Sequence, residues 1–203
     1  MPKLLLFSDV HSNKAFCSAI VEKARDHDIV LGAGDLGLAR RHLEISTRIL
    51  SQIAVPVILV PGNVESYEEL RSAFEQYDNF VILHGDSCEL LGYRFFGLGG
   101  GIPITPFGPW SYDFSEEQAA GLLSAAGKPD VLITHSPPVN AADQDSSGRH
   151  LGSVAIRSFV EAHQPILHVC GHIHESWNTF AKIGQTDVVN AGPHGINYTL
   201  PDR

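Results

Sequence analysis

Side chains of the kind that bind metal ions follow apolar segments of this chain at five separate places. They are Asp, His and Asn, whose oxygen and imidazole donors hold hard and borderline divalent cations. The five segments read Asp9-Val10-His11, Gly34-Asp35, Gly62-Asn63, Thr134-His135 and Gly171-His172-Ile173-His174. Residues two apart on an extended segment point the same way, so Asp9 with His11, and His172 with His174, can each face one pocket. The pattern predicts a two-metal centre of the hydrolytic type.

Taken singly, each donor has a plain structural explanation. An Asp after a strand commonly caps a helix or makes a turn, and a lone His is commonly a surface side chain. Folding requires none of the five strand ends to carry such donors, and their joint occurrence therefore favours the metal site.

The donor set also limits the metal. Imidazole and carboxylate donors without thiolates suit Mn, Fe, Co, Ni or Zn, of which we expect Mn or Fe. Two such ions about 3.5 to 4 Å apart acidify a shared water to hydroxide and neutralise phosphoryl oxygens during in-line displacement.

The elements that must position these donors follow from the hydrophobic pattern. In the first half, predicted strands alternate with predicted helices as in a parallel α/β sheet: strands 3–8, 28–33 and 57–60, helices 13–26, 42–52 and 67–77. Glycine-punctuated segments over 79–99 predict antiparallel strands. Later elements are helices 115–126 and 151–162 and strands 130–134, 166–170, 175–181 and 186–190. Ligands of α/β sheets bind beyond the carboxyl ends of strands, where the donors stand.

Length and composition bound the protein further. The 203 residues predict a single domain spanning 1–203. A net charge of −9 disfavours an extended nucleic-acid surface and fits a small phosphorylated substrate. Three widely spaced cysteines and a short N-terminal apolar run predict a cytoplasmic protein without a membrane segment. No residue pattern decides the oligomeric state.

The motifs resemble those of the calcineurin-like metallophosphoesterase superfamily, whose DxH, GD, GN, lone His and GHxH segments match from Asp9 to His174. Shorter matches, THSPP at 134–138, CGHIHES at 170–176 and VNAG at 189–192, resemble its small phosphodiesterase-type branch. The resemblance implies an α/β fold, a four-layer sandwich of two mixed β-sheets flanked by α-helices, with the metals at one edge.

The resemblance also implies which residues bind each metal. The first metal would be held by Asp9, His11, Asp35 and His174. The second would be held by Asp35, Asn63, His135 and His172. Asp35 would then bridge the two ions.

This sequence departs from the superfamily at one position. The family usually places a His after the Asn of its third motif, where it contacts phosphate and protonates the leaving group, whereas here Val64 follows Asn63. Losing a general acid costs about 100- to 10,000-fold with a poor leaving group. Activated diesters should therefore be favoured over alkyl monoesters. Glu65 keeps the acidic position, which we interpret as a helix-start carboxylate.

Three residues are candidates to replace the missing His at the phosphate. Arg149 and His150 lie in a polar loop, and His194 lies in a glycine-rich segment. Arginine suits bidentate phosphate binding. Alternatively, the first two residues stand at the start of a helix and the third is a turn residue.

The irregular stretch 99–112 carries three aromatic side chains, Phe107, Trp110 and Tyr112. They could stack on a nucleobase, as exposed aromatic rings do, or form the small core of their own loop.

Together these observations favour metal-dependent hydrolysis of a small phosphodiester, with nucleotides and cyclic nucleotides among the candidate substrates. The alternatives are a phosphomonoesterase, protein phosphatases included, and a non-catalytic metal-binding module on the same fold.

Overall fold

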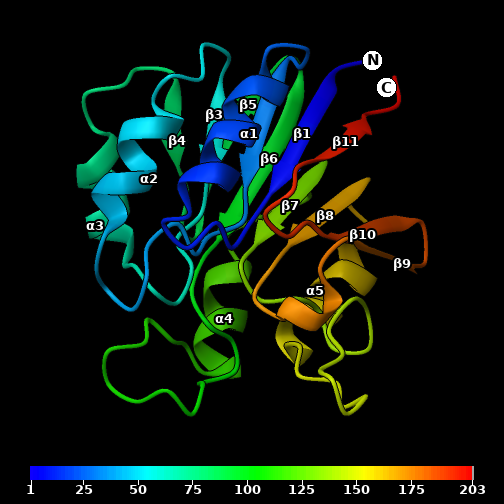
Figure 1. Cartoon of the computed structure of the whole chain (residues 1–203). Coiled ribbons are helices and arrows are strands. Elements are labelled where there is room, and N and C mark those ends of the chain that lie inside the picture. The colour runs from blue at the N-terminus through cyan, green and yellow to red at the C-terminus, as the bar shows by residue number, and fades with distance from the viewer. Residues whose placement is uncertain (203) are drawn as a thin grey trace.

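The computed structural model describes residues 1–202 and contains two β-sheets. The first sheet has the strand order β11-β1-β2-β3-β4. Its strands are β11 (Ile196–Thr199), β1 (Lys3–Phe7), β2 (Ile29–Gly32), β3 (Val57–Leu59) and β4 (Phe80–Ile82). All neighbours are parallel except β11, which pairs antiparallel with β1 and brings the two chain ends side by side (Figure 1).

The second sheet has the order β5-β6-β7-β8-β10-β9. Its strands are β5 (Asp86–Leu90), β6 (Tyr93–Leu98), β7 (Val131–Thr134), β8 (Leu167–Cys170), β10 (Thr186–Asn190) and β9 (Thr179–Ile183). The middle pairs are parallel and the two edge pairs antiparallel. Both sheets are therefore mixed, as the family resemblance implies.

Successive side chains of a strand point to opposite faces of its sheet, and this alternation produces the layers. In β1, Leu4 and Leu6 pack into a core shared with Phe95 and Ile133 of the second sheet. Leu5, between them, points to the opposite face, where the helices α1 (Lys14–Ala24), α2 (Leu43–Leu50) and α3 (Tyr67–Phe74) cover the first sheet. The helices α4 (Glu116–Leu123) and α5 (Val154–His163) cover the outer face of the second sheet. The result is the expected four-layer sandwich.

Side-chain caps set where several helices begin. Asn13 accepts from the amides of Ala15 and Phe16 at the start of α1. Ser66 and Ser115 each form a capping box with a residue three positions later. These caps hold the loops that leave the carboxyl ends of the preceding strands.

Three predicted elements differ from the structure. The 79–99 region is not entirely antiparallel, because β4 pairs in parallel with β3 and only β5 and β6 form a hairpin. The helix expected over 151–162 begins at Val154, since Ser153 caps it by accepting from the amide of Ile156. The strand expected over 175–181 begins at Thr179, because His174–Ser176 form a 3-10 turn.

Within residues 1–202, every helix is too short or too polar to cross a lipid bilayer.

Candidate metal centre

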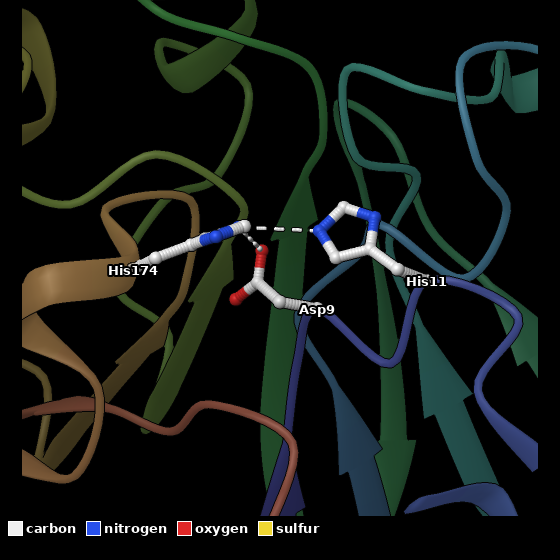
Figure 2. Close-up of side chains that lie close together, drawn as sticks. All are labelled: Asp9, His11 and His174. Atoms are coloured by element: carbon white, nitrogen blue, oxygen red, sulfur yellow. Dashed lines mark hydrogen bonds and ion pairs between the residues drawn. The ribbon is translucent and has the colours of Figure 1, made fainter.

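Three of the sequence-predicted donors meet where β1 ends and the β8 loop begins. His11 and His174 point toward each other beside Asp9 (Figure 2). Their Nε2 atoms lie 3.1 Å apart, and His174 Nε2 lies 3.7 Å from Asp9 Oδ1. His11 Nε2 lies 3.7 Å from Oδ2 of Asp35, the fourth member of this group. The structure thus brings together all four residues expected at the first metal.

The other donors gather around the second oxygen of Asp35. Its Oδ1 lies 3.3 Å from His135 Nε2. That nitrogen is 3.2 Å from Asn63 Oδ1 and 3.2 Å from His172 Nδ1. Asp35 therefore directs one carboxylate oxygen to each group. Asp9 lies between the groups, since its carboxylate is also within 4.8 Å of the Asp35 and His135 donor atoms.

Outer hydrogen bonds orient the donors. His135 Nδ1 donates to the carbonyl of Ala33 at 2.7 Å, and His11 Nδ1 donates to the carbonyl of Gly37 at 3.2 Å. Each bond requires the proton on Nδ1 and leaves Nε2 free to bind a cation. Such partners are the usual support of metal-binding imidazoles.

The asparagine and the first aspartate are oriented by residues that sequence reasoning missed. Asn63 Nδ2 donates to Ser111 Oγ at 3.0 Å, which turns its Oδ1 toward the other donors. Trp177 Nε1 donates to Asp9 Oδ2 at 3.1 Å. Neither partner carries a local signal, because both contacts join segments far apart in the chain.

The backbone is strained at several donors. Asp9, His11, Asp35 and His172 all have positive φ, of 54°, 43°, 59° and 70°. Non-glycine residues rarely adopt this region, and strain of this kind concentrates at functional sites. Main-chain hydrogen bonds hold this backbone conformation in place. The Asp9 amide donates to the carbonyl of Gly34 at 2.9 Å, and the His11 amide donates to the backbone carbonyl of Asp35 at 3.1 Å.

Two glycines beside the donors make room for the carboxylates. A Cβ on Gly62 would overlap Oδ1 of Asp35. A Cβ on Gly171 would come within 2.5 Å of Asp9 Oδ2. The glycines of the GN and GHxH segments are therefore explained by packing against the two aspartates.

Burial raises the pKa of the carboxylate donors and lowers the pKa of the buried imidazole donors. Burial, together with repulsion from Asp35, raises the pKa of Asp9 to about 7, and burial raises the pKa of Asp35 to about 7. Burial lowers the pKa of His135 and of His172 to about 3. Two buried carboxylates beside neutral imidazoles are what divalent cations would stabilise, so the donor set fits the implied metals.

Glu65 joins the loops that carry Asp35 and Asn63. Its carboxylate accepts from the amides of Gly62 and Gly37, both at 2.9 Å, and of Leu36 at 3.2 Å. Burial and the nearby Asp35 charge raise its pKa to about 7. The interpretation as a helix-start carboxylate is wrong, since the N-cap of α3 is Ser66.

The valine that replaces the family His is part of the site wall. Val64 is buried and lines the same cleft as Asp35 and Asn63. Its backbone amide donates to Asp35 Oδ1 at 3.1 Å. The residue supports the bridging carboxylate through its backbone, while its side chain has no proton to give.

The three candidate replacements lie outside the donor cluster. Arg149 is paired with Asp145 at 2.7 Å and its side chain is 75% exposed. His150 Nδ1 lies 2.6 Å from Asp143 Oδ1. His194 packs edge-on against Phe16 of α1, with ring centroids 5.1 Å apart. None of the three lines the cleft above the donors.

That cleft has a volume of about 600 Å³, and Phe107 and Trp110 form part of its wall. Tyr112 instead packs edge-on against Phe114, with ring centroids 4.9 Å apart. Two of the three rings therefore line the cleft, and Tyr112 belongs to the loop's own core.

The sandwich and its cluster of donors at the strand ends define a metallophosphoesterase-type α/β fold. The sequence pattern of the calcineurin-like phosphoesterase family matches residues 2–176, and the chain belongs to that family.

Individual relatives extend this comparison. The chain is 32% identical over 142 residues to human "Metallophosphoesterase domain-containing protein 1", covering 66% of this chain and 40% of that protein. It is 25% identical over 178 residues to "Probable glycerophosphodiester phosphodiesterase GpdQ" of Arcobacter nitrofigilis, covering 82% and 64%. The match thus spans less than half of the human relative and under two thirds of the bacterial one.

Among solved structures, the protein TT1561 of Thermus thermophilus has the same fold. Its TM-score is 0.76 at 20% identity, covering 95% of this chain and 90% of that chain.

Proposed function

We propose that this protein hydrolyses small phosphodiesters at a two-metal centre formed by Asp9, His11, Asp35, Asn63, His135, His172 and His174. The observation that carries the proposal is the placement of Asp35, whose two carboxylate oxygens lie 3.7 Å from His11 Nε2 and 3.3 Å from His135 Nε2. A carboxylate that faces two donor groups is suited to bridge two cations. The donor set suits Mn, Fe, Co, Ni or Zn, of which we expect Mn or Fe.

Two cations held there would acidify a water molecule and neutralise the phosphoryl oxygens. The chain's own residues prepare the site for that chemistry. Ala33 and Gly37 fix the tautomers of His135 and His11 through their carbonyls, so that Nε2 of each faces the centre. Asn63 offers its amide oxygen because Ser111 accepts from its amide nitrogen.

Two further observations support a diester as substrate. Val64 supplies no proton to a departing group. Arg149 and His150 are paired with Asp145 and Asp143, and neither of the two lines the cleft. A substrate with a good leaving group needs little protonation. A relative carries a phosphodiesterase name, which agrees with this preference.

The test is hydrolysis of bis-p-nitrophenyl phosphate against p-nitrophenyl phosphate by metal-stripped protein reconstituted with Mn²⁺. We expect metal-dependent turnover with a preference for the diester. Asp35→Asn should abolish turnover, whereas Asp86→Asn, at an exposed position on β5, should not. Retained activity in Asp35→Asn would overturn the proposed centre, and preference for the monoester would overturn the proposal that the substrate is a diester.

A further inference from the structure

The cleft above the donors has one markedly apolar wall. Residues from the loop after β6 and from the loop before α5 provide it: Pro103, Ile104, Pro106, Phe107, Trp110 and Leu151. Ile104 is 65% exposed, Phe107 52%, Leu151 42% and Trp110 39%. Large apolar side chains are usually buried, and an exposed group of them beside a cluster of functional residues marks a binding surface.

The two aromatic side chains of this wall are arranged in parallel. The rings of Phe107 and Trp110 have centroids 5.9 Å apart and planes inclined by 19°. Stacking between the two rings keeps them in one orientation, while each remains partly open to solvent. Such a pair can contact a further flat ring, because stacking on aromatic side chains requires an accessible face and no particular hydrogen bond.

Hydrogen bonds fix the aromatic loop relative to the metal donors. Asp113 Oδ2 accepts from the backbone amide of Thr105 at 2.9 Å and from its hydroxyl at 2.6 Å. Asp113 Oδ1 accepts from Ser111 Oγ at 2.7 Å, and that hydroxyl accepts from Asn63 Nδ2 at 3.0 Å. The wall and the asparagine donor therefore share one network, which holds the rings at a set distance from the centre.

The charges of the cleft indicate what does not bind to the wall. No Lys or Arg occurs among the residues of 1–202 that line it, whereas Asp145 and Glu175 do line it. Asp145 is paired with the guanidinium of Arg149 at 2.7 Å, and 75% of the Arg149 side chain is exposed. A second phosphate on the substrate would find no cationic side chain in this cleft, so the wall favours an uncharged group.

We propose that the wall of Ile104, Phe107, Trp110 and Leu151 selects phosphodiesters in which one ester group carries an uncharged, flat aromatic ring. The inference rests on the proposed function, because the phosphoryl group must be held at the metal donors for the ring to meet the wall. It names the substrate class of that centre and its specificity-determining residues.

The test compares phenylphosphonate with methylphosphonate as ligands of the Mn²⁺-loaded protein, by isothermal titration calorimetry. The carbon–phosphorus bond of both resists hydrolysis, so binding is measured without turnover. The two differ only in the group that would meet the wall. We expect phenylphosphonate to bind about 5- to 150-fold more tightly, the range that stacking of one ring gives.

The double variant Phe107→Ala/Trp110→Ala should bind the two phosphonates with nearly equal affinity. Phe180→Ala is the matched control, since Phe180 is 62% exposed on β9 and outside the cleft, and it should keep the selectivity. The single variants Phe107→Leu and Trp110→Leu keep apolar bulk and remove one ring each. They should lose part of the selectivity and leave methylphosphonate affinity unchanged.

The outcomes separate this inference from the proposed function. Equal affinity of wild type for both phosphonates, or undiminished selectivity in the double variant, would overturn the aromatic wall and leave the metal centre standing. Failure of both ligands to bind the Mn²⁺-loaded protein would overturn phosphoryl binding at the centre, and with it the proposed function.

Discussion

Metal binding by this protein should weaken steeply as the pH falls from 8 to 6. Burial raises the pKa of Asp9 and of Asp35 to about 7, and each must lose its proton to bind a cation. A carboxylate of pKa 7 is about 90% ionised at pH 8 and about 10% ionised at pH 6. Metal affinity should therefore fall about 10-fold for each aspartate, or about 100-fold for both.

The buried imidazoles should contribute little to this effect. Burial lowers the pKa of His135 and His172 to about 3, so both are already neutral at pH 6 and release no proton when a metal binds. Near pH 6 the two aspartates should therefore release more protons than these two imidazoles.

Calorimetric titration of metal-stripped protein with Mn²⁺ at pH 6, 7 and 8 measures the change. Buffers of different ionisation enthalpy give the number of protons released, which should be about two at pH 6 and close to zero at pH 8. An affinity that changes less than about 3-fold over this range would show that the aspartates are already ionised at pH 6, and would refute the argument from burial.

Three substitutions test other parts of the account. Ser111→Ala removes the hydroxyl that orients the asparagine donor and should weaken Mn²⁺ binding about 10- to 100-fold by calorimetry; unchanged affinity would contradict the orienting role. Val64→His should speed hydrolysis of alkyl esters by about 100-fold or more and barely change p-nitrophenyl esters, because only a poor leaving group needs a proton. Val64→Phe controls for bulk, and equal gains on both ester types would count against the acid role. Gly62→Ala should destabilise the fold by about 1–3 kcal/mol in urea unfolding and displace Asp35, whereas Gly121→Ala, in open space within α4, should stabilise it by about 0.5–1 kcal/mol. Equal effects of the two glycine substitutions would contradict the close packing.

The sequence predicts which side chains gather at the strand ends, because their positions follow from local patterns. Asp9 and Asp35 each follow a buried apolar strand after a short gap, and the carboxyl ends of parallel strands meet at one edge of a sheet. How the strands pair within each sheet depends less on local sequence. Residues 80–82 have the same apolar pattern whether the strand pairs in parallel or antiparallel, and only tertiary packing against β3 decides between them.

Contacts between distant segments could not be predicted. Ser111 lies 48 residues from Asn63, and Trp177 lies 168 residues from Asp9, so no spacing rule joins either pair. One contact within a single loop was not predicted either. The exposed Arg149 resembles a phosphate ligand in sequence, but Asp145 of its own loop binds its guanidinium.

The most direct test of the central claim is the number of metal ions that the folded chain binds. Metal-stripped protein titrated with Mn²⁺ should bind two ions per chain. His174→Ala should remove the site shared by Asp9 and His11, and His135→Ala should remove the site on the other side of Asp35, so that each variant binds one. One ion or none in the wild type, or two ions in either variant, would contradict a centre bridged by Asp35.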